Sequence, residues 1–289
     1  MITYVSNKTI DRQKYDACIA DAIQSKVYAF SWYLDAVTET WNVLVLKDYK
    51  AVMPLPTRKK YGIIYIFQPY WVQHLGVFSK SPLSEDYLKL FLDNIPKNIK
   101  FINYNINFKA NNIIFKTNYI LPLQDDYKSL YSCFSKLRKR SITKGKKANL
   151  VLKITDNWSP ILNLSKQKSA QDFKMTKEAF LKFEKLLNKA KQLNMLKILA
   201  AYSKENKLVG GAFFIISKKR ITYLFSVVSE QGRNLQAMSI ILNAVIKDYA
   251  DSDYILDFEG SMLPGVAAFF KSFKPQNEIY YHLKKWRLF

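Results

Sequence analysis

The chain has 289 residues, of which 49% are hydrophobic and 15% are aromatic. This length suits two domains of ordinary size, and this composition excludes disorder on a large scale. The net charge of +22 favours partners rich in phosphate, which include a nucleic acid, a nucleotide cofactor and an anionic membrane surface, although AT-rich coding is a second explanation for a chain rich in Lys, Ile and Asn.

Leader, membrane-spanning and metal-binding patterns are all missing from the sequence. The N-terminal stretch MITYVSNKTIDRQ has no basic start followed by an apolar core, and no apolar run approaches the roughly 20 residues that span a bilayer. We therefore expect a cytoplasmic protein. Cys18 and Cys133 lack the spacing of a zinc or redox motif and are expected to be buried thiols. His74 and His282 show no zinc-binding spacing, so we expect no catalytic metal.

The first half of the chain begins with a pattern of short strands. The stretch WNVLVLKDYKAVMPLPTRKKYGIIYIF, residues 41–67, predicts three strands with turns at 47–50 and 58–62. A helix follows in SEDYLKLFLDNI, where Ser84 and Glu85 are good N-terminal residues, and FINYNINF predicts another strand.

A polar and aromatic cluster lies between the third strand and that helix, in QPYWVQHLG, residues 68–76. An aromatic floor with amide edges suits a sugar or a peptide, so we treat this cluster as a candidate substrate site. A turn made by Pro69 and Gly76, with the aromatic rings packed beneath it, is an equally good interpretation. The candidate substrate-binding residues of the cluster are Gln68, Tyr70, Gln73 and His74.

A dense basic segment, FSKLRKRSITKGKKANLVLKI, separates the two halves and contains no acidic residue. Such a run is commonly the solvated face of a helix, and it is also typical of a surface that binds phosphate. No aromatic residue lies between Leu137 and Ile154 to stack on a base, so the segment cannot read a nucleic-acid sequence by itself. Arg138 within it is a further candidate for substrate binding.

The second half repeats the order of the first. Residues 198–225, ILAAYSKENKLVGGAFFIISKKRITYLF, predict three strands, QAMSIILNAVIKDYA predicts a helix with one buried face, and YILDFEGS predicts a strand. We therefore expect an α+β fold made of two similar halves.

The strand that ends in DFEGS carries two acids in an apolar run. In an extended strand, Ile255, Asp257 and Glu259 share one face, and Pro264 begins the next helix. A partly buried carboxylate with a raised pKa can accept the proton of an attacking amine, so Asp257 is the first candidate for a catalytic base and Glu259 the second. Helix capping or an ion pair with a nearby Lys or Arg is the alternative.

The strand order of the second half resembles the GNAT acyltransferase fold. Two such units in tandem, joined by a segment like LRKRSITKGKKANL, resemble the FemAB-like peptidyltransferases and the BioF2-like acetyltransferase-domain proteins; the segments DFEGS and QPYWVQHLG are distinctive. This resemblance implies two mixed, mostly antiparallel sheets flanked by helices, in an N-terminal acceptor domain (1–126), a basic helical linker (127–147) and a C-terminal donor domain (148–289).

The resemblance also implies a function. It implies transfer of an acyl or aminoacyl group to an amine of a small molecule, sugar or peptide, from acetyl-CoA or another acyl-CoA, or from an aminoacyl-tRNA, in the cleft between the halves. The GNAT cofactor rests on backbone N–H groups where a helix follows the central strand. The corresponding residues here are Val227, Val228, Gly232, Arg233, Asn234, Gln236 and Ala237.

The donor loop departs from the GNAT pattern, because Gln236 and Met238 occupy positions that the pattern reserves for small residues. A side chain there can block the close approach of a pyrophosphate to the backbone. The alternative function is therefore an inactive GNAT-like fold that binds RNA or an anionic envelope component through the basic linker, including peripheral contact with an anionic membrane.

Overall fold

The computed structural model describes residues 1–110, 113–168, 176–260 and 262–287. The chain divides into two compact units, and each consists of separate segments of the sequence. Unit 1 contains Met1–Thr117, Glu178–Lys189 and Ile279–Phe289; unit 2 contains Asn118–Lys177 and Ala190–Glu278. The domain boundaries expected from the sequence, 1–126, 127–147 and 148–289, remain predictions. The compact unit 1 also includes two segments from later in the chain, Glu178–Lys189 and Ile279–Phe289.

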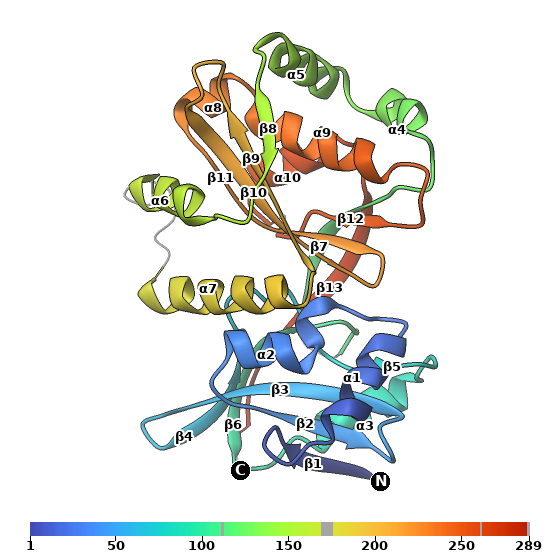
Figure 1. Ribbon diagram of the computed structural model, residues 1–289. Helices are drawn as coiled ribbons and strands as arrows, with labels where there is room; N and C mark the ends of the chain where they lie inside the picture. Colours follow the sequence, from blue (N-terminus) through green and yellow to red (C-terminus); the bar gives the residue numbers. More distant parts are fainter. Residues whose placement is uncertain (111–112, 169–175, 261, 288–289) are drawn as a thin grey trace. The chain divides into compact units, whose positions relative to one another are not determined.

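Unit 1 is built on a mixed sheet (Figure 1). Its strand order is β1-β2-β3-β4-β6-β13, in which β4 and β6 are parallel and the other neighbours are antiparallel. The strands are β1 (Ile2–Ser6), β2 (Trp41–Leu46), β3 (Ala51–Lys60), β4 (Ile63–Phe67), β6 (Ile99–Ile106) and β13 (Gln276–Trp286), and the short β5 (Phe78–Ser79) pairs with β3. The helices are α1 (Arg12–Asp21), the 3₁₀ helix η1 (Val27–Ala29), α2 (Ser31–Val37), α3 (Glu85–Asp93) and most of α7 (Lys177–Gln192).

Unit 2 repeats this arrangement. Its strand order is β8-β9-β10-β11-β12-β7, in which β11 and β12 are parallel and the other neighbours are antiparallel. The strands are β7 (Ile113–Pro122), β8 (Val151–Ile154), β9 (Leu196–Tyr202), β10 (Leu208–Ser217), β11 (Arg220–Val228) and β12 (Ile255–Asp257). The helices are α4 (Tyr127–Cys133), α5 (Lys136–Lys147), α6 (Ser159–Lys168), α8 (Glu230–Asn234), α9 (Ala237–Tyr249) and α10 (Pro264–Lys271).

The last strand of each half completes the sheet of the other unit. The C-terminal part of β13 pairs with β6 in unit 1, while the C-terminal part of β7, which follows β6 in the chain, pairs with β12 in unit 2. The predicted α+β fold of two similar halves is confirmed, and this strand swap was not predicted.

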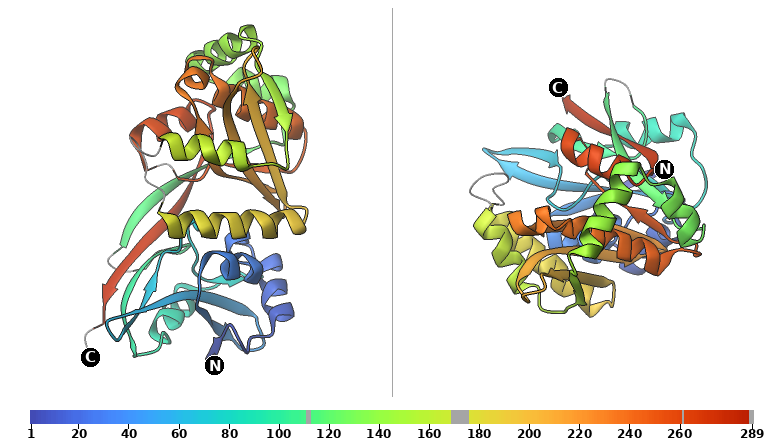
Figure 2. Two further views of the ribbon diagram at one scale, coloured as in Figure 1. Left: turned by 60° about the vertical axis from the view of Figure 1, so that its left-hand side comes forward. Right: turned by 90° about the horizontal axis from the view of Figure 1, so that it is seen from above.

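The core of unit 2 explains why its helices form. Helix α9 buries Ile241, Leu242 and Val245 against the sheet, and α10 buries Phe270, while α6 contacts β10 and β11 from the other face (Figure 2). Gly145 lets α5 approach α9 closely, because a Cβ atom at this position would lie 2.5 Å from Cγ1 of Ile240.

Two local expectations were wrong. Cys18 is buried but Cys133, the last residue of α4, is exposed, because it lies on the solvent side of that helix. Strand β12 ends at Asp257 rather than at Gly260, because Glu259 and Gly260 have φ angles of 47° and 48°, which are incompatible with an extended strand.

Candidate active site

The parallel strands β11 and β12 of unit 2 are paired only at their beginnings. Their register runs from Arg220–Ile255 to Thr222–Asp257, and β11 then continues to Val228. Within the described residues, no strand pairs with this edge of β11 beyond Thr222. Strand β11 also bulges at Leu224, because Phe225 pairs with Phe213 and Tyr223 pairs with Phe214. An edge of β11 that pairs with no described strand therefore begins where the two strands separate.

Asp257 lies at the point of separation. Its side chain is completely buried, and its Oδ2 lies 2.5 Å from Nη1 of Arg220. Its Oδ1 accepts hydrogen bonds from Nδ2 of Asn118 at 2.7 Å and from the backbone N–H of Glu259 at 3.1 Å. Both carboxylate oxygens thus have strong donors within the fold, as a buried anion requires.

Arg220 joins this carboxylate to a second one. Its Nη2 lies 2.9 Å from Oε1 of Glu278, and the Nδ2 of Asn118 lies 3.2 Å from Oε2 of the same residue. The side chains of Arg220 and Glu278 are 16% and 26% exposed, so the network runs from the interior toward the surface of unit 2.

Glu259 follows two residues after Asp257, but its side chain is placed differently. The left-handed backbone of Glu259 and Gly260 turns the chain sharply, so the expected alternation with Asp257 stops here. The fold brings the two predicted acids together, since Glu259 donates its N–H to Asp257, and leaves Glu259 partly exposed. The catalytic roles of both residues remain predictions.

The predicted donor loop forms the end of β11, the short helix α8 and the start of α9. Ser229 caps α8 by accepting the N–H of Gly232 at 3.0 Å. A Cβ atom on Gly232 would lie 2.1 Å from the carbonyl oxygen of Val209, so this glycine allows α8 to lie against β10. Gly232 therefore has a packing role whether or not the loop binds a donor.

Gln236 precedes α9 in a left-handed conformation, with a φ of 63° and no capping hydrogen bond from its side chain. Its Nε2 donates to the carbonyl of Arg233 at 3.2 Å, and its Oε1 accepts from Oγ of Ser239 at 3.3 Å. The first N–H groups of an α-helix have no partner within the helix and attract anions. The side chain of Gln236, at a position that the GNAT pattern reserves for a small residue, is thus folded back onto its own loop.

The other predicted donor residues differ in accessibility. Arg233 and Asn234 are exposed, Val227 and Ala237 are buried, and Val228 is partly buried. Arg233 can therefore reach a phosphate, whereas the contribution of Val227 or Ala237 is limited to its backbone.

Arg138, a predicted substrate-binding residue, is only 4% exposed. Its Nε donates to Oγ of Ser272 at 2.9 Å, its Nη1 donates to Ser239, and its guanidinium lies 4.1 Å and 4.5 Å from the ring centres of Phe269 and Phe273. Burial lowers the pKa of Arg138 to about 10. These contacts join α5 to α9 and to α10, which gives Arg138 a packing role beside its predicted one.

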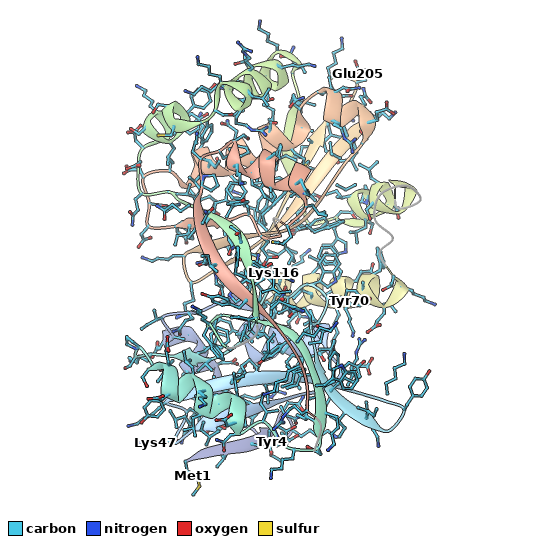
Figure 3. All side chains as sticks on the ribbon, turned by 180° about the vertical axis from the view of Figure 1, so that it is seen from behind. Met1, Tyr4, Lys47, Tyr70, Lys116 and Glu205 are labelled. Carbon is cyan, nitrogen blue, oxygen red and sulfur yellow. The ribbon has the colours of Figure 1, made fainter. Side chains whose placement is uncertain are left out.

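The predicted substrate loop of unit 1 is held tightly by its own amides. Oε1 of Gln68 accepts the N–H of Asn105 at 2.7 Å, and its Nε2 donates to the carbonyl of Val72. Trp71 donates from Nε1 to the carbonyl of Ala179 in α7 at 2.9 Å. Tyr70, labelled in Figure 3, is 38% exposed.

Gln73 and His74 form the buried end of this loop. Nδ1 of His74 lies 3.2 Å from Oε1 of Gln73, and the imidazole is stacked on Tyr280 with 5.2 Å between ring centres. Gln73 is 8% exposed, and its Nε2 has no hydrogen-bond partner among the described residues. Because a buried amide donor normally has a partner, this group is compatible with the predicted role of Gln73 in substrate binding, which remains a prediction.

Sequence reasoning missed Arg220, Asn118 and Glu278. A polar residue inside an apolar strand was a usable signal for Asn118, which is completely buried in β7. No local pattern links Arg220 to Asp257, since they are neighbours only because β11 and β12 pair in parallel.

Comparisons with known proteins place this geometry in a fold group. No protein-family model matches the chain, and no curated protein matches it either. Among solved structures, FemX is similar with a TM-score of 0.69 and 11% identity over 97% of this chain and 96% of FemX. The C-terminal domain of a putative lysylphosphatidylglycerol synthetase from Agrobacterium fabrum has a TM-score of 0.56 and 10% identity, with coverage of 94% and 92%. A tandem GNAT protein from the clavulanic acid biosynthesis pathway has a TM-score of 0.54 and 9% identity, with coverage of 98% of both chains.

The chain therefore has a tandem GNAT fold of the FemX type. The predicted resemblance to GNAT and FemAB-like proteins is confirmed at the level of the fold. No helix among the residues placed by the structure is long and apolar enough to cross a membrane.

Proposed function

We propose that the protein is an N-acyltransferase that holds an activated acyl donor in unit 2. The observation that carries this proposal is the separation of β11 and β12. It leaves an edge of β11 without a neighbouring strand, beside Asp257 and Glu259 and before the start of α9. In unit 1, the corresponding strand β4 ends at Phe67, where its pairing with β6 also ends. Only unit 2 thus offers an unpaired edge of this kind, among the strands described, for an extended donor.

The reaction consists of attack by an amine on the carbonyl carbon of the donor. A backbone N–H on the free edge of β11 stabilises the negative charge that forms on the carbonyl oxygen. A carboxylate takes the proton lost by the amine, the new C–N bond forms, and the bond to the leaving group breaks. From an acyl-CoA the leaving group departs as a thiolate. From an aminoacyl-tRNA it departs as a ribose hydroxyl, after the carboxylate passes the proton taken from the amine to the ribose oxygen.

The burial of the two acids divides their roles within this proposal. Glu259 is partly exposed, although its Oε1 is buried, and we assign the proton to this carboxylate; Asp257 is completely buried and both of its oxygens bind donors within the fold. We therefore assign Glu259 the role of base and Asp257 the role of a positioning residue, which fixes the backbone N–H of Glu259.

Binding of the donor phosphates is assigned to Arg233 and the first N–H groups of α9, and recognition of the amine acceptor to the loop of Gln68 to Gly76 in unit 1. The likeness of the fold to FemX and to a tandem GNAT protein supports transfer of an acyl or aminoacyl group, from acyl-CoA or from an aminoacyl-tRNA. Acyl-CoA and aminoacyl-tRNA both carry phosphates and a reactive acyl carbon. The same cationic and N–H groups can therefore bind either donor.

Substitution of Glu259 tests the base. We expect Glu259→Gln to lower the rate of acyl transfer by about a hundredfold or more, since general base catalysis contributes this much. The thermal midpoint should stay unchanged, and Glu230→Gln, an exposed acid of α8, is the matched control. A Glu259→Gln variant with the parental rate removes Glu259 from the mechanism.

Titration calorimetry with CoA, acetyl-CoA and an aminoacyl-tRNA identifies the donor. Arg233→Gln should weaken binding of the true donor several-fold, because an exposed charge-assisted hydrogen bond to phosphate is lost. Lys247→Gln, an exposed cation near the end of α9, removes the same charge as a control. Binding of none of the three compounds contradicts the proposed donor site.

A further inference from the structure

The basic segment between the two halves folds as helix α5, Lys136–Lys147, and presents a stripe of cations. Arg138, Ile142 and Gly145 form its buried face. Lys136, Arg140, Lys144 and Lys147 are exposed and follow one another at intervals of three or four residues. At about 100° per residue these four side chains fall within about 80° of arc, opposite the buried face.

No carboxylate neutralises this stripe. In the described parts of the chain, none of the four cations forms an ion pair, although many other lysines and arginines do. The stripe is about 16 Å long, from the rise of 1.5 Å per residue. The stripe also points away from α9 and the donor loop, because the opposite, buried face of α5 makes the contact with α9. A small donor bound at the start of α9 therefore does not use these cations.

An exposed apolar residue lies beside the stripe. Leu137 is 70% exposed and lies on the same side of the helix as Lys144, two turns earlier. From Lys136 to Ile154 there is no aromatic side chain that could stack on a base. Cations in a row with an apolar side chain among them favour the surface of an anionic bilayer, where the charges meet lipid headgroups and the apolar side chain enters the interface.

We propose that the exposed face of α5 docks the protein on an anionic lipid bilayer. The binding is peripheral and electrostatic, with Leu137 as a shallow anchor. It goes beyond the proposed acyl transfer and does not depend on it, because no residue of the stripe belongs to the candidate active site.

Co-sedimentation of the full chain with lipid vesicles tests this inference. We expect the protein to bind vesicles of phosphatidylcholine mixed with phosphatidylglycerol, not vesicles of phosphatidylcholine alone, and to dissociate as salt is raised. The variant K136Q/R140Q/K144Q/K147Q should lose binding by about 600-fold, since each of the four cations near an anionic surface contributes about fivefold. Leu137→Gln should weaken binding several-fold without changing its dependence on salt.

A matched variant separates the stripe from the total charge. K8Q/K59Q/K60Q/K97Q removes the same number of exposed positive charges from unit 1 and should keep most of the vesicle binding. Equal losses in the two quadruple variants, or no binding of the parent protein to anionic vesicles at low salt, overturn the proposal. Filter binding with duplex RNA is run in parallel, and loss of RNA affinity in the α5 variant without loss of vesicle binding also overturns it. Circular dichroism and the thermal midpoint confirm that each variant is folded.

Discussion

Asp257 is the residue whose chemistry depends most on its surroundings. Its carboxylate is completely buried, and Arg220 is the cation that balances it. Removal of one partner from a buried ion pair leaves a charge without compensation and costs about 3 kcal/mol or more. We therefore expect Asp257→Asn to lower the free energy of unfolding by about 2 to 4 kcal/mol, because Glu278 still pairs with Arg220.

Chemical denaturation of Asp257→Asn, Arg220→Gln and the double variant measures this coupling. The sum of the losses of unfolding free energy in the two single variants should exceed the loss in the double variant. Simple additivity of the two losses contradicts a direct role of the pair in stability.

His282 provides a test that depends on pH. Burial lowers its pKa below the usual 6.5, and the nearby cations Lys116 and Lys284 lower it further. Its Nδ1 lies 3.0 Å from Oδ1 of Asn105, an oxygen that also accepts a hydrogen bond from Lys116. The folded protein thus binds this proton more weakly than the unfolded chain, so stability should fall as the pH drops through 6.5 toward the pKa of the folded state.

Proton NMR can follow this titration directly, because the chain has only 2 histidines. The ring resonance that disappears in His282→Gln should titrate below pH 6.5 in the parent protein. The same variant should show a weaker loss of thermal midpoint between pH 7 and pH 5. A His282 resonance that titrates above 6.5 contradicts the assigned environment.

At the scale of elements, the approach of α5 to α9 depends on one missing side chain. A Cβ atom on Gly145 would lie 2.5 Å from Cγ1 of Ile240 and 3.2 Å from the carbonyl oxygen of Leu235. Gly145→Ala should therefore displace α5 and lower the free energy of unfolding by about 1 to 3 kcal/mol, the usual range for overpacking.

Gly265 in α10 is the matched control, because a Cβ atom there has no neighbour within 4 Å. Gly265→Ala should be neutral or should stabilise the protein by up to about 1 kcal/mol through its helix propensity. Thermal denaturation of both variants checks the pair, and a larger loss in Gly265→Ala contradicts the described packing.

The elements that the sequence predicted best are those with a clear local period. Alternation indicated β2 to β4 and β9 to β11, and helical spacing together with Ser84 indicated α3 and α9. The basic linker was predicted to be helical. The sequence did not predict which of its cations is buried, since Arg138 differs from its neighbours only in its position around the helix. The candidate acids were found because charge is rare in an apolar strand, whereas Arg220 was missed because its contact with Asp257 depends on strand pairing.

At the scale of the whole molecule, each compact unit draws on distant parts of the chain. Unit 1 includes most of α7 and the C-terminal part of β13, so it is not the N-terminal half alone. The local patterns of β7 and β13 contain no information about which sheet each strand joins. That choice is made by contacts between residues more than a hundred positions apart, such as Tyr281 with Ile106.

Native-state hydrogen exchange tests this assignment. With rising denaturant, the amides of Ala179 to Lys189 and of Tyr280 to Trp286 should open together with β2, β3 and β6, because they belong to the same unit. Gly145→Ala should lower protection in unit 2 first. Opening of α7 together with β9 and β10 contradicts the division.

The position of β13 in the sheet of unit 1 also constrains biosynthesis. During translation, β6 leaves the ribosome long before residues 279–286, which form its neighbouring strand. The nascent N-terminal part therefore has an unprotected sheet edge until residues 279–286 have been made. Newly made chains should depend on chaperones during this interval, and ribosomes stalled before codon 279 should carry a polypeptide that proteases cut readily.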